Sequence, residues 1–342
     1  MSKKILVPWA MPDIGRAILK NSKAEVAFLH GPGGEVPGIA ELIEGTLQSE
    51  VLITRADHAI PRKVLSANPG LRGIANYGVG YSNIDIAYAT ELGVPITNTP
   101  GVLTETTADL AWALLMATAR QVPQAHRYTL SGEWKALGGR TFMGLDIGPG
   151  GSNRPKVLGI IGFGRIGQAV ARRSRGFKMK VIAFDPPLKA LIEKNRGVAY
   201  RDLDDLLGES DFITIHCPLT KETRHLIGAK ELKLMKPTAV LINTARGPIV
   251  DEKALLSAVK QKRIAAAGLD VYEKEPDITP GLLKLENVVL LPHIGSATED
   301  TRGQMAVLAA KNAIAMLRGK RPRNIVNPEV FGSADYLRRI GG

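Results

Sequence analysis

The sequence of 342 residues contains a single cysteine, Cys217, which excludes a disulfide framework and a cysteine-based metal cluster. Aromatic residues make up only 5% of the chain. No apolar run reaches the roughly 18 residues of a transmembrane helix. The apolar stretch near the N-terminus is short and soon interrupted, unlike that of a signal peptide. No cluster of side chains has metal-ligand spacing. We therefore expect a cytoplasmic, globular protein without a metal ion or a membrane partner.

Basic residues exceed acidic ones, with 45 Lys and Arg against 33 Asp and Glu and a net charge of +12. Such an excess can mark a nucleic-acid surface. However, the basic residues are scattered, and the densest groups, at 172–175 and 320–323, have no interleaved aromatic residues. We expect no nucleic-acid partner, and interpret the charge as a positive field that attracts small anions.

Short apolar runs alternate with amphipathic stretches along the chain. Near-continuous apolar strands separated by helical segments are typical of parallel sheets covered on both faces, which predicts an α/β fold. The runs form two series, too many for one small sheet, so we expect two doubly wound parallel-sheet domains. The first series lies at 3–7, 25–30, 50–54, 71–76 and 94–98, and the second at 156–161, 180–185, 211–216, 239–244, 266–271 and 287–291.

Three other segments connect or cover these sheets. The Gly- and Pro-rich stretch 138–155 is typical of a surface loop ahead of the second series. The segment 104–120 is apolar on most sides, with Thr104 as a candidate N-cap, and predicts a buried helix between domains or subunits. A second long helix is expected at 298–318, where it would follow the last strand and cross back to the first domain.

The strongest motif is Gly162-Phe163-Gly164-Arg165-Ile166-Gly167, between a predicted strand and a predicted helix. In this context the three glycines allow a tight turn, a close approach of the backbone to a pyrophosphate, and close packing of helix on strand. The N-terminus of the helix would attract the phosphates. The motif therefore predicts a dinucleotide-binding site.

Asp185 ends the next predicted strand after the glycine motif. A carboxylate there would accept hydrogen bonds from both ribose hydroxyls of NAD and would repel the 2′-phosphate of NADP. The alternative is a turn residue before two prolines. We expect NAD(H) as the cofactor. NADP is the less favoured alternative, because Arg201 or Lys189 could offset the negative charge of Asp185.

Three segments carry polar residues at or just beyond predicted strand ends, where an open parallel sheet forms its ligand crevice. They are 243–252 with Arg246, 267–276 with Asp270, Glu273 and Glu275, and 291–298 with His293. An arginine, a carboxylate and a histidine beside a nicotinamide fit hydride transfer to a carbonyl. The arginine would bind an anionic oxygen, the histidine would give the proton, and the carboxylate would favour the protonated imidazole.

Together these segments resemble the D-isomer-specific 2-hydroxyacid dehydrogenase family. The similarity runs from about residue 50 to about residue 328 and is weaker before that. It includes A-N-Y-G-V-G-Y-S-N-I-D (75–85), N-T-P-G-V-L-T-E-T-T-A-D (98–109), H-C-P-L-T (216–220), the glycine motif and the three segments above. Within the family, the stretch 98–109 and the ending N-I-V-N-P-E-V are most similar to glyoxylate and hydroxypyruvate reductases.

The resemblance implies roles for individual residues. Arg246 would bind the carboxylate and carbonyl of the substrate, and His293 would be the general acid in reduction. Glu275 matches the glutamate of the family pattern D-V-Y-x-x-E-P, so Glu273 would be a solvated neighbour. Backbone N–H groups of Val79 and Gly80 would bind the substrate carboxylate. The cofactor would contact the glycine motif and Asp185, Pro186, Pro187, His216, Pro218, Thr244, Ala245, Arg246, Asp270, His293, Ile294 and Gly295.

The resemblance also implies a fold and an activity. A Rossmann cofactor domain at 102–295 would be inserted into a flavodoxin-like substrate domain formed by 1–101 and 296–342. The expected enzyme is a homodimer that uses NADH to reduce a small 2-oxo acid, glyoxylate or hydroxypyruvate. Selectivity for the substrate side chain would come from the loops around 54–58, 77–81 and 99–104.

Two alternatives stay open on the sequence. One is another enzyme of the family, of the phosphoglycerate or D-lactate type. The other is an NADH-sensing binding protein similar to the C-terminal-binding corepressors. Formate dehydrogenases carry Gln in place of Glu275, and phosphite dehydrogenases carry Lys in place of Val79, so neither branch is favoured.

Overall fold

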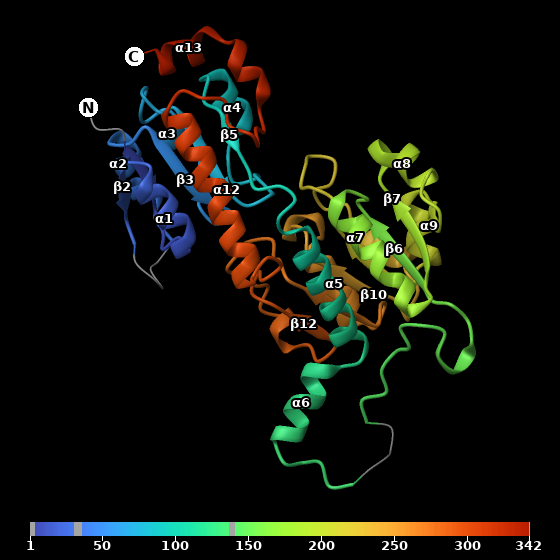
Figure 1. Ribbon diagram of the computed structural model, residues 1–342. Helices are drawn as coiled ribbons and strands as arrows, with labels where there is room; N and C mark the ends of the chain where they lie inside the picture. The colour runs from blue at the N-terminus through green and yellow to red at the C-terminus, as the bar shows by residue number, and fades with distance from the viewer. Residues whose placement is uncertain (1–3, 31–35, 137–140, 342) are drawn as a thin grey trace. The chain divides into compact units, whose positions relative to one another are not determined.

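The computed structural model describes residues 4–30, 36–136 and 141–341, and the chain divides into two compact units. Unit 1 comprises Met1–Leu103 and Ala297–Gly342, and unit 2 comprises Thr104–Ser296. Each unit is built around one parallel sheet (Figure 1). The prediction of an α/β protein with two doubly wound sheets is confirmed.

The sheet of unit 1 has the strand order β2-β1-β3-β4-β5, and every neighbouring pair is parallel. This is the flavodoxin-like order, in which the chain reverses direction across the sheet beside β1. The strands are β1 (Lys4–Val7), β2 (Glu25–Phe28), β3 (Val51–Arg55), β4 (Gly73–Tyr77) and β5 (Ile96–Thr97).

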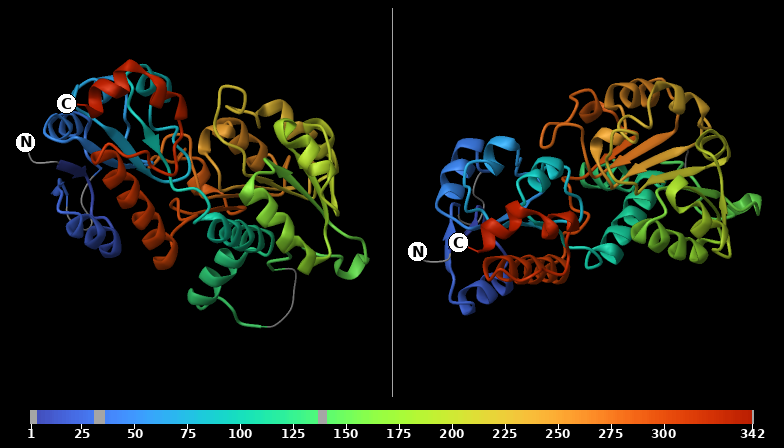
Figure 2. Two further views of the ribbon diagram at one scale, coloured as in Figure 1. Left: turned by 45° about the horizontal axis from the view of Figure 1, so that its top comes forward. Right: turned by 90° about the horizontal axis from the view of Figure 1, so that it is seen from above.

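Side chains of the unit 1 strands alternate between two hydrophobic clusters, as the period of two in a strand requires. Ile5 and Val7 contribute to one cluster, and Leu6 contributes to the other. The first face is covered by α1 (Asp13–Asn21) and α12 (Glu299–Leu317), which lie side by side (Figure 2). The second face is covered by α2 (Ile39–Leu47), α3 (Arg62–Leu65) and α4 (Ile86–Glu91), and α13 (Ala334–Ile340) comes last in the chain.

The sheet of unit 2 has the order β12-β11-β10-β9-β6-β7-β8, again with parallel neighbours. Counted within the unit, this is the Rossmann order 3-2-1-4-5-6 with a seventh strand added. The strands are β6 (Val157–Ile161), β7 (Lys180–Phe184), β8 (Val198–Tyr200), β9 (Phe212–Ile215), β10 (Val240–Asn243), β11 (Ala266–Leu269) and β12 (Val288–Leu290).

The short edge strand β8 is absent from the strands predicted by sequence. It has only three residues, none of which is fully buried, so its apolar signal is weak. One face of the sheet is covered by α5 (Thr104–Ala119), α7 (Arg165–Ser174) and α8 (Lys189–Glu193), and the other by α9 (Leu203–Glu209), α10 (Ala229–Leu234) and α11 (Glu252–Lys260).

The apolar segment predicted at 104–120 forms α5, and half of its 16 residues are buried. They pack on α7, β10 and β11 within unit 2. The apolar character of this helix is therefore explained by its own unit and requires no partner chain. In contrast, α6 (Val122–Leu130) has no buried residue and extends away from the sheet of its unit (Figure 1).

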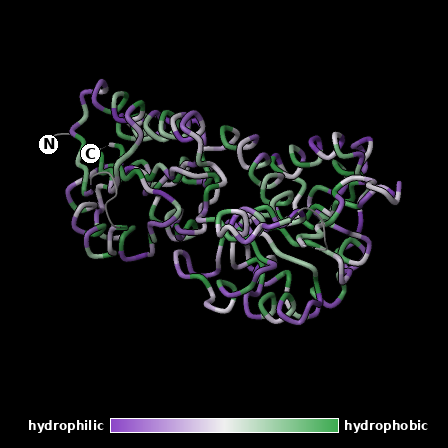
Figure 3. The backbone as a smooth tube through the Cα atoms, turned by 90° about the horizontal axis from the view of Figure 1, so that it is seen from below, coloured by the Kyte–Doolittle hydropathy of each residue, from purple (hydrophilic) through white to green (hydrophobic). Residues whose placement is uncertain are grey.

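Hydrophilic and hydrophobic residues are interleaved along the chain (Figure 3). Amphipathic helices such as α1 and α7 bury one side, as layered packing requires, whereas half of the residues of α5 are buried and none of those of α6 is. None of the described helices has the length and apolarity needed to span a membrane.

Candidate active site

The glycine-rich motif joins the end of β6 to the start of α7, at the carboxyl edge of the unit 2 sheet. Gly162 has φ +93°, and a Cβ there would lie 2.3 Å from the backbone nitrogen of Cys217. A Cβ at Gly167 would lie 2.1 Å from the carbonyl oxygen of Gly162, so both positions require glycine. A Cβ at Gly164 would meet nothing within 4 Å. This open space at the start of α7 fits a pyrophosphate.

Asp185 follows β7 at the same edge and contacts the glycine-rich loop. Its Oδ2 accepts a hydrogen bond of 2.8 Å from the backbone N–H of Phe163, whose side chain is buried. The carboxylate therefore supports the loop and keeps a second oxygen for a ligand. Pro186 and Pro187 come next as exposed residues, in a short 3-10 turn.

The two cations considered as partners of Asp185 are engaged elsewhere. Arg201 donates from Nε to Glu209 at 2.7 Å and from Nη1 to the carbonyl oxygen of Tyr200 at 2.9 Å. Lys189 places its ammonium 4.5 Å from the centre of the Tyr200 ring. Neither side chain forms an ion pair with Asp185, so the negative charge at the end of β7 has no ion pair among the described residues.

β10 ends at Asn243, whose side chain organises the turn that carries Arg246. The Asn243 amide donates to the Arg246 carbonyl oxygen at 2.9 Å and accepts from the Ala245 N–H at 3.0 Å. Burial lowers the pKa of the Arg246 guanidinium, and the negative charge of Glu275 acts in the opposite direction. Sequence reasoning missed Asn243, and the amide at the last position of a strand was the signal for it.

Glu275 and His293 meet beyond the ends of two neighbouring strands, β11 and β12. Oε2 of Glu275 lies 2.6 Å from Nδ1 of His293, and Oε1 accepts from the backbone N–H of Tyr272 at 3.0 Å. His293 has φ +53°, a left-handed conformation that persists only where the surroundings impose it. The strained backbone at His293 thus belongs to the residue whose imidazole ring is held by the Glu275 carboxylate.

The charge of Glu275 is maintained by its surroundings. Burial raises the pKa of this carboxyl, but the hydrogen bond and charge of His293, the N–H of Tyr272 and the charge of Arg246 outweigh burial, and the pKa is lowered. Glu275 is therefore ionised at neutral pH. An ionised carboxylate at this distance stabilises a positive charge on the imidazole.

Asp270 is fully buried at the end of β11 and holds the loop that follows His293. Its Oδ1 accepts from the Ile294 N–H at 2.7 Å, and its Oδ2 accepts from the Gly295 N–H at 2.8 Å. Burial raises the pKa of Asp270, although these two N–H groups oppose the rise. Thr107, at the start of α5, donates to the Gly295 carbonyl oxygen at 3.1 Å, a contact that sequence analysis did not anticipate.

Three more predicted cofactor residues lie beyond the ends of β9 and β10. Burial lowers the pKa of His216 to about 3, so its ring is neutral, and its Nε2 lies 2.8 Å from Thr214 Oγ1. Pro218 is exposed. The hydroxyl of Thr244 is buried and has no hydrogen-bond partner in the described part of the chain. This hydroxyl lies at the same edge of the sheet as the glycine-rich loop. A polar atom of a bound ligand would satisfy its hydrogen-bonding capacity.

Glu273 is not the solvated neighbour that the sequence suggested. Its Oε1 lies 2.6 Å from Nε2 of His225, and its Oε2 accepts from the Glu252 N–H at 3.3 Å. The carboxylate of Glu252, which is 3% exposed, accepts in return from the Glu273 N–H at 2.5 Å. These reciprocal bonds join the start of α11 to the loop that carries Glu275. His225 therefore belongs to a second His–Glu pair.

Val79 and Gly80 belong to unit 1, in the loop that follows β4. The Asn98 side chain donates to the Val79 carbonyl oxygen at 2.9 Å, and the Asn76 side chain donates to the Gly80 carbonyl oxygen at 2.9 Å. Both carbonyl groups are thus held by asparagine side chains. The loop lies at the carboxyl edge of its sheet, where parallel sheets bind ligands.

Unit 2 therefore gathers groups suited to carbonyl chemistry at one sheet edge. It offers a glycine-rich loop at a helix N-terminus, a guanidinium for an anionic oxygen, and a histidine held by an ionised carboxylate. Among the residues that the structure describes, no group of three or more His, Cys, Asp and Glu side chains is placed to hold a metal ion.

The family model for the NAD binding domain of D-isomer specific 2-hydroxyacid dehydrogenases matches residues 112–295. The chain is also 47% identical over 336 residues to glyoxylate reductase of Thermococcus litoralis, covering 98% of this chain and 99% of that protein. The chain belongs to the D-isomer specific 2-hydroxyacid dehydrogenase family. It is therefore an oxidoreductase, and its unit 2 contains the family's NAD-binding domain.

Solved structures of similar proteins cover nearly the whole chain. A glyoxylate reductase from Paecilomyes thermophila has a TM-score of 0.81 and 33% identity, over 96% of this chain and 99% of that one. An NADPH-dependent glyoxylate/hydroxypyruvate reductase from Sinorhizobium meliloti, in complex with NADP and malonate, has a TM-score of 0.82 and 31% identity, over 96% and 98%. Proteins of this fold thus include one in complex with NADP, so the fold by itself does not select NAD over NADP.

Proposed function

We propose that this protein reduces glyoxylate to glycolate, and hydroxypyruvate to its 2-hydroxy acid, with NADH as the preferred cofactor. The observation that carries the proposal is the pair of Glu275 and His293, 2.6 Å apart at the sheet edge that also bears Arg246. Curated relatives named glyoxylate reductase, at 47% identity over nearly full length, support the choice of substrate. In this proposal unit 2 is the cofactor domain and unit 1 is the substrate domain.

His293 acts as the general acid in the proposed reduction. Because its Nδ1 faces Glu275, Nε2 is the nitrogen that gives a proton to the carbonyl oxygen as that oxygen becomes an alkoxide. Glu275 holds the ring in one orientation and stabilises the imidazolium, as a buried aspartate does in serine proteases. In oxidation His293 would take the proton back as a base.

Arg246 binds the substrate in this mechanism. Its planar guanidinium suits a carboxylate and an adjacent carbonyl oxygen, whose negative charge grows in the transition state. The proposal also assigns the backbone N–H groups of Val79 and Gly80 to the substrate carboxylate. A nicotinamide cofactor, when bound, would supply the hydride for the carbonyl carbon.

The cofactor would be held by the glycine motif and by residues at the ends of the neighbouring strands. The unfilled space at Gly164 would take the pyrophosphate, and Asp185 would accept from the ribose hydroxyls. The preference for NADH is supported by the engagement of Arg201 with Glu209, which leaves the carboxylate of Asp185 uncompensated toward a 2′-phosphate. The remaining contacts would come from Pro186, Pro187, His216, Pro218, Thr244, Ala245, Asp270, Ile294 and Gly295.

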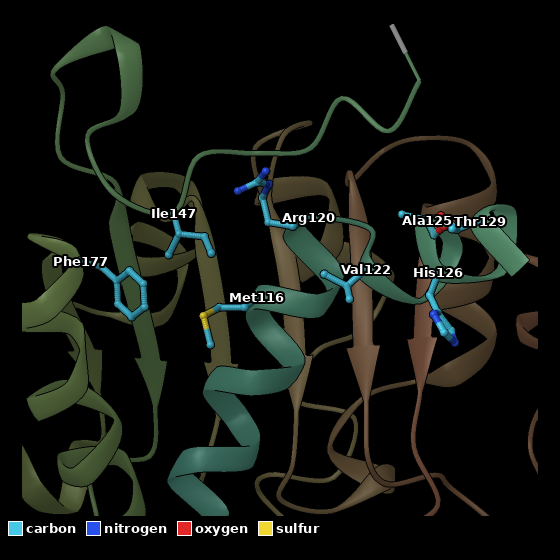
Figure 4. A pocket seen from close by; sticks show the side chains of 8 residues that line it. All are labelled: Met116, Arg120, Val122, Ala125, His126, Thr129, Ile147 and Phe177. Atoms are coloured by element: carbon cyan, nitrogen blue, oxygen red, sulfur yellow. Dashed lines mark hydrogen bonds between the residues drawn. The ribbon is translucent and has the colours of Figure 1, made fainter. Parts of the chain in front are cut away.

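The proposal includes a homodimer formed through α6 and its surroundings. A hollow of about 650 Å³ is lined by Met116, Val122, Ile147 and Phe177, with Arg120 and His126 at its side (Figure 4). Large apolar side chains nearby are exposed, including Leu130 at 74% and Trp134 at 55%. Such a patch is typical of a subunit contact. Sedimentation of the protein and of Leu130→Asp would test it, since the variant is expected to run as a monomer.

This hollow is distinct from the proposed active site. α5 begins beside Gly295 and ends at the hollow, and its 16 residues span roughly 24 Å. The dimer contact would therefore leave the catalytic edge of the sheet accessible. A cytoplasmic location, and the absence of nucleic-acid and membrane partners, remain part of the proposal.

One assay tests the activity directly. Addition of glyoxylate to the purified protein with NADH should produce a steady fall in absorbance at the wavelength of NADH. His293→Ala should lose roughly 10²–10⁴-fold in kcat, the contribution of a positioned acid–base group. Absence of turnover with glyoxylate and hydroxypyruvate, together with tight NADH binding, would favour an NADH-sensing binding protein. Turnover of phosphohydroxypyruvate or pyruvate alone would favour another branch of the family.

A further inference from the structure

The carboxyl ends of three neighbouring strands of unit 1 bring an arginine, two aromatic rings and a carboxylate together. Arg55 is the last residue of β3, and its guanidinium carbon lies 5.8 Å from the centre of the Trp9 ring, just beyond β1. The Trp9 ring in turn lies 5.4 Å from the ring of Tyr77, at the end of β4. The Arg55 guanidinium therefore lies over the Trp9 ring, at the carboxyl edge of the sheet, where parallel sheets bind ligands.

The charge of Arg55 is already matched within the chain. Its Nε donates to Asp57 Oδ1 at 2.7 Å and its Nη2 donates to Asp57 Oδ2 at 2.5 Å, so the two planar groups form a bidentate pair. Burial alone would raise the pKa of Asp57, but the hydrogen bonds and charge of Arg55 outweigh burial and lower it. Asp57 is therefore ionised at neutral pH and occupies the donors that would otherwise face a ligand anion.

This pair is fixed to the same edge as the loop of Val79 and Gly80. Residues Arg55 and Tyr77 are paired in the register of β3 and β4. Asn83, just past that loop, donates to the Arg55 carbonyl oxygen and to the His58 carbonyl oxygen, each at 3.0 Å. The loop proposed to bind the substrate carboxylate and the turn carrying the pair are thus tied together.

We infer that Asp57 is a specificity-determining residue that neutralises Arg55 and thereby restricts the enzyme to 2-oxo acids whose side chains carry no second negative charge. The inference rests on the proposed function and adds a substrate class to it. With Asp57 in place, a dianionic 2-oxo acid meets a neutral pair and must displace a carboxylate that is tethered two residues away. Without Asp57, the fork of Arg55 is free to bind a second carboxylate or a phosphate.

The alternative is a surface ion pair of no functional consequence, since exposed pairs contribute little to stability. Both side chains are partly exposed, at 32% for Arg55 and 42% for Asp57. A structural role alone would alter stability but would not change the ranking of substrates. Substrate ranking is therefore the measurement that separates the two.

The test compares kcat/KM for glyoxylate and hydroxypyruvate with that for 2-oxoglutarate and oxaloacetate. Asp57→Asn should raise the ratio of kcat/KM for the two dianions to kcat/KM for glyoxylate by at least about tenfold, the scale of a gained charge-assisted contact. The double variant Arg55→Gln/Asp57→Asn should lose this gain. Asp13→Asn, which removes a carboxylate 3.2 Å from Arg16 on α1, is the matched control and should leave the ranking of the substrates unchanged.

Three outcomes would overturn the inference: a wild-type enzyme that uses the dianions as well as glyoxylate, no gain in Asp57→Asn, or a gain that survives removal of Arg55. A wild-type protein that reduces no 2-oxo acid would instead contradict the proposed function. In that case calorimetric titration of 2-oxoglutarate with NADH present still tests the inference. Tighter binding to Asp57→Asn than to the wild type supports it, and equal binding contradicts it.

Discussion

Nδ1 of His293 and Oε2 of Glu275 are 2.6 Å apart, the distance of a short charge-assisted hydrogen bond. Glu275 keeps its charge because the pKa of its carboxyl is lowered: burial would raise that pKa, but His293, Tyr272 and Arg246 outweigh burial. The pair therefore presents Nε2 of a ring that is both oriented and electrostatically supported.

Glu275→Gln should keep appreciable activity but should move the alkaline limb of the reduction profile to lower pH. The amide retains a hydrogen-bonding group but no negative charge, so the imidazolium loses its partner. The measurement is kcat for glyoxylate reduction across the pH range. Glu273→Gln is the matched control, because Glu273 pairs with His225 and not with His293, and it should leave the limb in place. If Glu273→Gln moved the limb and Glu275→Gln did not, the role would belong to Glu273.

Arg246→Lys should raise KM for 2-oxo acids and lower kcat. An ammonium cannot form the two parallel hydrogen bonds of a guanidinium, and the contact to the carbonyl oxygen strengthens in the transition state. Steady-state kinetics with glyoxylate and with hydroxypyruvate measure both parameters. An unchanged kcat/KM would remove Arg246 from the substrate site.

Asp185→Asn and Asp185→Ala should differ in an informative way. Both variants should weaken the binding of NADH and strengthen the binding of NADPH, each by about 1–2 kcal/mol, the scale of a hydrogen bond. The asparagine can still accept from the Phe163 N–H, whereas alanine removes that bond to the glycine-rich loop. Compared with asparagine, alanine should therefore bind NADH and NADPH more weakly by the same factor, as titration by fluorescence would show. Wild-type protein that prefers NADPH would contradict the role of Asp185.

His58 should make the protein less stable in mild acid. Burial lowers its pKa from 6.5 to about 4; the nearby charge of Asp57 opposes this shift, whereas those of Arg55 and His30 add to it. Between these values the unfolded chain binds a proton and the folded chain does not. The free energy of unfolding should thus fall by up to about 3 kcal/mol as the pH drops from 6.5 to about 4.

The test for His58 is urea unfolding across that pH interval. His58→Leu should reduce the pH dependence, because it removes one of the two histidines that burial keeps neutral in the folded chain; His216 remains in the variant. Equal slopes in the wild type and in His58→Leu would show that His58 is accessible to protons in the folded state.

Much of the fold follows from local patterns. Strands that are apolar at successive positions, such as Ile5, Leu6 and Val7, are buried on both faces, and this predicts parallel sheets. β8 escapes the same reasoning, because an edge strand of three half-exposed residues has no such pattern. That strand forms because of its position at the edge of the sheet, which is a property of the tertiary structure and not of the local sequence.

The site was predictable in part for a similar reason. The spacing of Gly162, Gly164 and Gly167 predicts their roles. A Cβ at Gly162 or Gly167 would collide with the backbone, whereas Gly164 leaves open space at the start of α7. The contacts of Glu273 with His225 and of Arg55 with Asp57 depend on side chains turning toward one another in the fold. No periodicity in the sequence predicts such side-chain contacts, so they are seen only in the three-dimensional structure.

The insertion of unit 2 between Leu103 and Ala297 has a consequence for synthesis on the ribosome. The face of the first sheet that α12 covers is translated early, but α12 itself emerges only after unit 2 is complete. At 5–20 residues per second, roughly 190 intervening residues impose a delay of about 10–40 s. During that interval a nascent chain carries Ile5, Val51 and Ala75 on an uncapped surface, while unit 2 is already able to fold. The nascent polypeptide should therefore depend most on chaperones over its first hundred residues, until α12 leaves the exit tunnel and covers that face.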